Sequence, residues 1–213
     1  MNYLRKVAVI LASLSMVACG GNSVRYDNSA GKATIYEDVG TTSNQVSGIG
    51  VESQDIVSMT DQMMRDMLQN PTLMGGVQAP RVIIDSQYMM NESTSTINKN
   101  MLTDRLRINL NRASNGRLIF VGRQYASMVA KERELKRQGM VDGGTIRTTQ
   151  ATAGADYRLG GRITSLDSMD SKTQLKSRYH QVTFEMIDLE LGTIVWSGIY
   201  EFKKTAQDDI IYR

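Results

Sequence analysis

The apolar residues between positions 53 and 69 recur at the spacing of one face of a helix. Ser53 is the expected N-cap, and Asn70-Pro71 is the expected end, because proline disfavours helical backbone in the residue before it. The apolar face consists of Ile56, Met59, Met63 and Met67, and is widened by Val57, Met64 and Leu68. Methionine side chains also form adaptable binding surfaces. The alternative is that these side chains pack in the core. A stripe of apolar residues at helical spacing favours that alternative, so we expect this face to belong to the core.

A second helix is expected to begin with Ser95 or Thr96 as its N-cap. It ends at Asn115-Gly116, a pair that is typical of a left-handed helix end. Its inward residues are expected to be Met101, Leu102, Leu106 and Leu110.

A third helix is expected from Arg123 to Gln138, with Gly139 at its end. One side of it is apolar and consists of Tyr125, Met128, Val129 and Leu135. Residues 131–137 carry a run of mixed charges that includes Glu132 and Lys136 at the spacing of neighbours on a helix surface. This mixture favours a solvated face over a site for a charged partner.

Five runs of residues predict strands. They are Arg81–Asp85, Leu118–Val121, Ala155–Ile163, Tyr179–Asp188 and Ile194–Phe202. Consecutive apolar residues form the second run and the middle of the first and predict buried strands, whereas apolar and polar residues alternate in the last three. In the last run, the residues expected on one face are Ile194, Trp196, Tyr200 and Phe202. Gly192 supplies the positive φ of the short hairpin loop before that run.

The remaining segments are expected to be loops. Asn91–Thr96 is polar, and Val141–Thr149 contains glycine and leads into a short helix near Ala151–Ala153. The order of elements predicts an α/β (α+β) fold with a mixed sheet of about five strands flanked by helices. The elements occur in the order β-α-β-α, followed by a three-strand antiparallel meander. The first half of the sheet is therefore expected to be parallel.

The first nineteen residues have the pattern of an export signal. Arg5 and Lys6 precede an apolar run, Val7–Val17, which is shorter than the roughly 20 residues that cross a bilayer. The run leads to Ala18 and to Cys19, the only cysteine in the chain. This resembles the bacterial lipobox, in which the cysteine is lipidated and becomes the new, acylated amino terminus. An ordinary secretory signal with a chance cysteine is the alternative, and it would leave an unpartnered thiol in an oxidising compartment.

The expected signal and the composition of the segments after it divide the chain into four parts. Residues 1–18 are the expected signal peptide, 19–47 a flexible tether after lipidated Cys19, 48–204 the globular domain and 205–213 a C-terminal tail. The tether is rich in Gly, Ser, Thr and Asn, and it has too few apolar residues to offset the entropy of ordering. Gly20, rather than Asp, after the cysteine favours sorting to the outer membrane, by resemblance to bacterial sorting rules.

Charge and residue types exclude several classes of function. Of the 25 basic residues two lie in the signal peptide, which leaves 23 against 22 acidic residues and gives no basic excess for nucleic acid. His180 is the only histidine, lies on an expected strand and is interpreted as structural. Asp85, Asp156 and Asp188 lie at strand ends, where turn formation explains them. No phosphate loop or nucleophile elbow is present, so we expect no enzyme, no metal and no cofactor.

Three segments together resemble one family. They are Ser53-Gln54-Asp55-Ile56 with Met63–Leu68, Gly154-Ala155-Asp156-Tyr157 with Gly160, and the hairpin Asp188–Gly198. With the lipobox, they resemble the LpoB family of outer-membrane lipoproteins, which activate penicillin-binding proteins. The hairpin also occurs, more loosely, in CsgG-like secretion lipoproteins and in the N-terminal domain of TolB.

The resemblance implies a non-enzymatic role. The chain would be anchored by its lipid in the inner leaflet of the outer membrane, on the periplasmic side. It would act as a monomer that binds and stimulates a bifunctional penicillin-binding protein, a peptidoglycan synthase, and so regulate cell-wall synthesis. The alternative is a CsgG-like component of a secretion or envelope assembly. Family members commonly carry a long, proline-rich linker, whereas both prolines here, Pro71 and Pro80, lie inside the expected domain.

Overall fold

One mixed sheet organises the fold. The computed structural model describes residues 48–206 except 75, 150 and 174. Within these ranges the strands are β1 (Arg81–Ile83), β2 (Met89–Glu92), β3 (Ile119–Phe120), β4 (Tyr157–Met169), β5 (Lys176–Asp188) and β6 (Ile194–Ala206). The strand order is β3-β1-β4-β5-β6, and β2 also pairs with β4. β1, β2 and β3 form parallel pairs, whereas β4, β5 and β6 form an antiparallel meander, so the predicted mixed sheet is confirmed.

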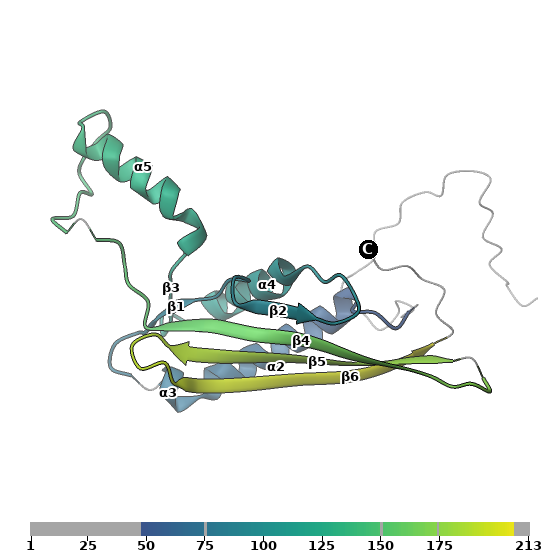
Figure 1. The fold of residues 1–213 in the computed structure, drawn as a ribbon. Coiled ribbons are helices and arrows are strands. Elements are labelled where there is room, and N and C mark those ends of the chain that lie inside the picture. The colour runs from purple at the N-terminus through teal and green to yellow at the C-terminus, as the bar shows by residue number, and fades with distance from the viewer. Residues whose placement is uncertain (1–47, 75, 150, 174, 207–213) are drawn as a thin grey trace, which may run out of the picture. The chain divides into compact units, whose positions relative to one another are not determined.

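Two helices pack on the same face of this sheet, as Figure 1 shows. They are α2 (Ser53–Gln69) and α4 (Lys99–Ala113), and the short helix α3 (Pro71–Met74) follows α2. The methionine stripe of α2 is buried in the core, as expected, and Met59, Met63 and Met67 are each at most 1% exposed.

The ends of α2 show how polar side chains direct the chain. The N-cap is Glu52 and not Ser53, and its backbone N–H donates to the Asp55 carboxylate at 2.8 Å. The predicted N-cap was wrong because Glu52 forms a capping box with Asp55, which lies inside the helix three residues after Glu52. At the other end, Asn70-Pro71 ends α2 as expected and also begins α3, because the Asn70 side chain accepts a hydrogen bond from the Leu73 N–H at 3.1 Å.

α4 begins later than the sequence predicts. Its N-cap is Asn98, whose side chain accepts from the Asn100 N–H at 3.1 Å, and not Ser95 or Thr96. Met101 is 53% exposed and therefore does not point inward, because the core face of α4 consists of Leu102, Leu106 and Leu110. The expected left-handed end is present, with a φ of 50° at Asn115 and 80° at Gly116.

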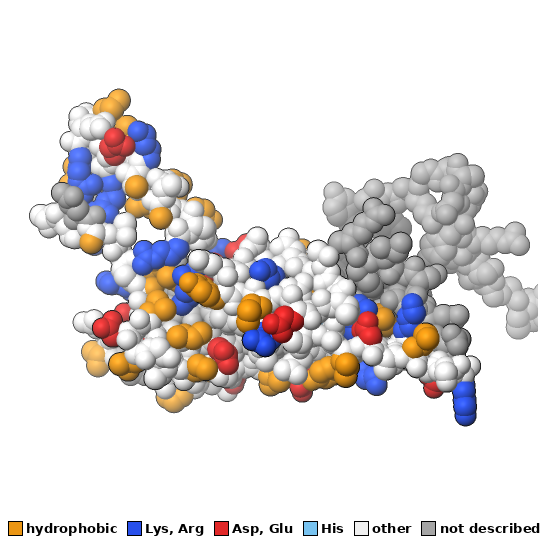
Figure 2. Space-filling model, viewed as in Figure 1, with side chains coloured by type: hydrophobic (Ala, Val, Ile, Leu, Met, Phe, Trp, Pro, Cys, Tyr) orange, Lys and Arg blue, Asp and Glu red, His pale blue; other side chains and the backbone are white. Residues whose placement is uncertain are grey.

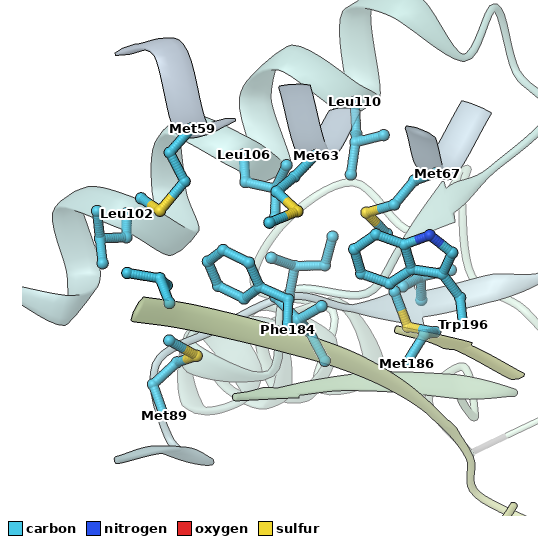
Figure 3. Packing of buried hydrophobic residues seen from close by; sticks show 14 of the residues in the cluster. Met59, Met63, Met67, Met89, Leu102, Leu106, Leu110, Phe184, Met186 and Trp196 are labelled. Carbon is cyan, nitrogen blue, oxygen red and sulfur yellow. The ribbon is translucent and has the colours of Figure 1, made fainter. Parts of the chain in front are cut away.

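The core fills the space between α2, α4 and the meander (Figure 3). Phe184 of β5 is fully buried at its centre, and the methionines of α2 and the leucines of α4 lie around it. Trp196 of β6 is 6% exposed, and its indole N–H donates to the Asp66 carboxylate of α2 at 2.8 Å. The alternation predicted for β5 is confirmed, since Val182, Phe184 and Met186 are all buried.

A β-bulge alters the face of one residue of β6. Met186 pairs with Trp196 and the next residue, Ile187, pairs with Ile194, so Val195 is the extra residue. Ile194 therefore points away from the core and is 55% exposed, which contradicts the prediction that it shares a face with Trp196.

The segment between α4 and β4 is the part that the prediction describes least well. β3 has two residues, lies at the edge of the sheet and leaves Ile119 48% exposed, so it is not the buried strand that was expected. The third helix is present as η1 (Arg123–Tyr125) and α5 (Ala126–Arg137). No residue of α5 is buried, so its apolar side does not pack on the sheet. The charged run 131–137 is a solvated face, as expected, and the short helix expected near 151–153 is absent.

Gly161 offers a test of how closely the strands pack. A Cβ atom built on Gly161 would lie 2.6 Å from the Met89 sulfur and nearer still to the Thr183 carbonyl oxygen. We expect Gly161→Ala to lower the free energy of unfolding by about 1–3 kcal/mol, measured by urea denaturation, because the backbone atom cannot move aside. Gly154→Ala is the matched control, with nothing within 4 Å of its Cβ and an expected change below about 0.5 kcal/mol. Equal losses in the two variants would contradict this account.

Candidate partner-binding surface

The aspartates at the strand ends satisfy backbone groups. The Asp156 carboxylate accepts from the Arg81 N–H at 2.7 Å, and Asp188 accepts from the N–H groups of Glu190 and Leu191 at 2.8 and 2.9 Å. Asp85 forms an ion pair with Arg158 at 2.8 Å. Asp85 also accepts from the Gln87 N–H at 3.1 Å, so the interpretation as turn residues is confirmed for Asp85 and Asp188. It is wrong for Asp156, whose carboxylate bonds the backbone of the neighbouring strand β1. These contacts give none of the three the arrangement of an acid–base pair.

His180 is part of the core. Its side chain is buried, its Nε2 lies 2.7 Å from the Ile49 carbonyl oxygen, and its ring stacks on Phe202 with 4.7 Å between centroids. Burial lowers the pKa of His180 below its ordinary value of 6.5, against the opposing effect of the Ile49 hydrogen bond. The structural interpretation of His180 fits this environment, because a buried neutral ring has no access to a substrate.

The buried His180 gives folding a pH dependence. Because its pKa is lowered in the folded state, the unfolded chain gains a proton first as the pH falls through 6.5, and stability declines below that pH. The decline due to this group has a slope of at most about 1.4 kcal/mol per pH unit. We expect wild type to be more stable than His180→Gln at pH 7.5 by urea denaturation, and this difference to shrink at pH 5.5. A difference that stays constant with pH would contradict the prediction.

The described residues also bear on metal binding and on membrane insertion. Among the described residues, no group of three or more His, Cys, Asp or Glu side chains could hold a metal ion. The same part of the chain contains no helix with the length and hydropathy needed to cross a membrane. Cys19 lies outside the described residues, so its lipidation stays a prediction.

The outward face of β4–β6 is the broadest feature available to a partner. We call it the open face, because α2 and α4 both pack on the opposite side of these strands (Figure 1). Figure 2 views the molecule from this side and shows hydrophobic side chains scattered among acidic and basic ones. The exposed hydrophobic residues of the open face are Leu166, Ile194 and Ile199, and Met90 of β2 lies beside them.

Polar contacts hold the side chains of the open face in place. Tyr179 of β5 donates to the Glu201 carboxylate of β6 at 2.5 Å, and this hydrogen bond raises the pKa of Tyr179 above its ordinary value. Arg162 of β4 lies 3.5 Å from Glu92 of β2 in an ion pair. Ile199 is opposite Thr183, which in turn is opposite Arg162, so one strand separates the exposed apolar side chain of Ile199 from the half-exposed ion pair of Arg162 and Glu92. Such a mixture is typical of surfaces that bind proteins reversibly.

The size of the open face fits a protein partner. Each of its three strands has 13 residues. At about 3.3 Å per residue and about 4.8 Å between strands, the face measures about 600 Å². A stable protein–protein interface buries about 800 Å² on each partner, so neighbouring loops would complete it.

The sequence contained a signal for this surface that the prediction did not use. The polar positions that alternate with the core residues of β5, including Tyr179 and Gln181, all lie on the open face. The alternation alone shows that these side chains point away from the core. Only the packing of α2 and α4 shows that no helix covers them. The prediction named no docking residue, and Arg162, Ile199 and Glu201 are therefore new candidates.

The comparison with protein families decides the classification. The family model for the peptidoglycan-synthase activator LpoB matches residues 55–202, which include most of α2, all of α4 and most of the meander. This chain belongs to the LpoB family. The resemblance inferred from the sequence is confirmed, and LpoB is by its description an activator.

Two LpoB domains are among the solved structures that are similar to this chain. The C-terminal domain of LpoB from Escherichia coli has 18% sequence identity and a TM-score of 0.38, and the match covers 67% of this chain and 94% of that one. The LpoB C-terminal domain from Salmonella enterica has 22% identity and a TM-score of 0.36, covering 68% and 96%. Lipoprotein GNA1162 from Neisseria meningitidis has 16% identity and a TM-score of 0.32, covering 62% and 87%. Because these scores are low, membership of the LpoB family rests on the family model. No curated protein matches this chain significantly.

Proposed function

We propose that this protein is an outer-membrane lipoprotein that binds and activates a bifunctional penicillin-binding protein. It would thereby regulate peptidoglycan synthesis without catalysing a reaction itself. The observation that carries the proposal is the LpoB family match over residues 55–202. The contacts of the strand-end aspartates and of His180 support a non-enzymatic role, because they commit these groups to the fold.

The expected anchor supports a location on the periplasmic side of the outer membrane. Cys19 follows the pattern of a lipobox, and residues 20–47 would connect the lipid to the domain. A flexible coil of that length spans about 30 Å on average. It reaches about 90–100 Å only when fully extended. The synthase would therefore have to project toward the outer membrane to be bound without strong stretching of the tether.

Activation by docking is a shift between conformations of the synthase. The protein can favour the active conformation only as far as it binds that conformation more tightly than the resting one. An ordered surface serves this purpose, because side chains that are already fixed lose little entropy on binding. The open face has this property, since Tyr179, Glu201, Arg162 and Glu92 are held by the contacts described above. We assign the open face to the synthase.

A reconstituted assay tests the function. A purified soluble domain, residues 46–213, is expected to increase glycan polymerisation from lipid-linked precursor by a purified bifunctional penicillin-binding protein. It should do so as a monomer and without detergent. No stimulation by a folded domain would contradict the proposal. Ring-shaped oligomers in the electron microscope would favour the CsgG-like alternative, and degradation of peptidoglycan by the domain alone would indicate a hydrolase.

Two isoleucines of equal exposure test the assigned surface. Ile199 lies on the open face and is 49% exposed, whereas Ile108 lies on α4 and is 48% exposed. We expect Ile199→Arg to lower the affinity for the synthase at least about tenfold, because it introduces an uncompensated charge into an apolar contact. Ile108→Arg should leave the affinity within about twofold, and both variants should unfold at nearly the same urea concentration. Equal effects on binding would remove the open face as the docking surface.

A further inference from the structure

A groove lies between the β3 edge of the sheet and the segment that contains α5. Its volume is about 660 Å³. One wall consists of β3 and its neighbours, including Ile119, Phe120 and Val121. The other wall consists of α5 residues, including Val129 and Arg133, and of the chain that returns from α5 toward β4. In Figure 1, α5 rises from the end of the sheet that carries β1 and β3.

The charge of this groove is of one sign. Six basic residues line it, namely Arg81, Arg123, Arg133, Lys136, Arg137 and Arg147, and no acidic residue is among its described lining residues. Within the described ranges, none of the five arginines forms an ion pair with a carboxylate. The chain from Cys19 onward has nearly equal numbers of basic and acidic residues, so this positive region is local. A concave site of one sign concentrates ligands of the opposite charge.

Two of the basic side chains shape the groove. Arg133 donates to the Thr149 carbonyl oxygen at 2.8 Å, and Lys136 donates to the Thr145 hydroxyl at 2.7 Å. These bonds tie α5 to the returning chain and so complete the outer wall. Arg81, Arg123 and Arg147 are exposed, and their guanidinium groups are available to a ligand.

The inner wall offers backbone hydrogen bonds. The N–H groups of Ile119 and Val121 donate to the carbonyl oxygens of Pro80 and Val82, both at 2.9 Å. Because peptide groups along a strand alternate in direction, the N–H and C=O of Phe120 point the other way, to the free edge of the sheet. Phe120 also lines the groove, so this free edge faces the basic residues.

We infer that the groove binds an extended, acidic segment of a protein partner, which adds as a strand to the free edge of β3. Its backbone pairs with Phe120, and its carboxylates pair with Arg81, Arg123 and Arg147. A polypeptide is the ligand that offers backbone donors and acceptors together with acidic side chains. A membrane surface supplies the negative charge alone and is not concave. The inference does not depend on the proposed function.

Model peptides test the charge. Residues 20–213, which lack the expected signal peptide and the cysteine that would carry lipid, are titrated against a fluorescein-labelled decapeptide of alternating Thr and Glu, and binding is measured by fluorescence anisotropy. We expect binding that weakens with added salt, and no binding of the Thr–Lys decapeptide. Arg123→Glu combined with Arg147→Glu should weaken binding at least about tenfold. Arg112→Glu combined with Lys203→Glu changes the net charge equally outside the groove and should change binding less than about twofold. Equal losses in the two double variants would overturn the site.

Two further measurements test strand addition. The Phe120 amide should exchange its hydrogen more slowly when the Thr–Glu peptide is bound, because it becomes hydrogen-bonded. A Thr–Glu decapeptide that is N-methylated at every residue has the same charge and no backbone N–H group to donate to β3, and it should bind at least about tenfold more weakly. Equal binding of the two peptides, or unchanged Phe120 exchange, would overturn the inference. So would binding to phosphatidylglycerol vesicles through Arg123 and Arg147 with no binding of the Thr–Glu peptide.

Discussion

Replacing Phe184 with alanine should lower the free energy of unfolding by about 3–5 kcal/mol. Phe184 is fully buried, and in Figure 3 its ring lies among the side chains of α2 and α4. The loss combines the transfer free energy of the ring with the cavity that remains, because Met63, Leu106 and their neighbours can fill it only in part. Urea denaturation of residues 46–213 measures the change.

Glu185→Ala is the control for this variant. Glu185 is the next residue on β5, and its side chain points to the open face. Its removal should change the free energy of unfolding by less than about 0.5 kcal/mol. If the two substitutions cost the same, the sheet would not be packed on one face only.

Replacing Cys19 with alanine should abolish anchoring and, with it, activation in cells. The thiol is the proposed site of lipid attachment, and stable anchoring needs more than one acyl chain, at about 0.8 kcal/mol per buried CH₂ group. Cells fed radioactive fatty acid should label the wild-type protein but not Cys19→Ala, and the variant should leave the outer-membrane fraction. Ser23→Ala, in the expected tether, should retain both label and location.

Purified components separate anchoring from docking. Because Cys19 is absent from residues 46–213, the soluble domain should stimulate the purified synthase whether or not the full chain can be lipidated. Equal fatty-acid label in wild type and Cys19→Ala would exclude this cysteine as the lipidation site. A variant that still activates in cells after losing its label would show that docking does not need the anchor.

The elements set by local sequence were predicted well. The apolar spacing of α2 and the alternation of β5 each depend on residues a few positions apart, so both the elements and their buried faces follow from the sequence. The left-handed end after α4 was found for the same reason, because Asn115-Gly116 favours positive φ by itself.

The wrong predictions concern residues whose structure is determined by contacts with residues far away in the sequence. Ile194 has a typical core pattern, but the bulge opposite Met186 and Ile187 reverses its direction. β2 was partly assigned to a polar loop, because Met90, Asn91 and Glu92 are exposed and only Met89 enters the core. Its strand conformation results from pairing with β4, more than 70 positions away.

The exposure of α5 has a similar explanation. Its apolar spacing predicts a packed helix, but α2 and α4 already cover the helical face of the sheet. The open face and the groove were not predicted, because both depend on how elements that are far apart in the sequence pack together. The lipidation of Cys19 stays a prediction, and it depends only on seven neighbouring residues, Leu14–Gly20, because a processing signal is recognised in a linear sequence.

The methionine-rich core links the fold to oxidation chemistry. Met59, Met63, Met67, Met89 and Met186 are each at most 1% exposed, whereas Met128 and Met140 are more than 60% exposed. Thioethers adapt to irregular spaces, but a sulfoxide is polar and would lack a partner in this interior. Peroxide should therefore reach the outer methionines first without harm to the fold. Oxidation of the inner set requires the domain to open, and once it has occurred it would prevent the chain from closing again until a reductase restores the sulfur.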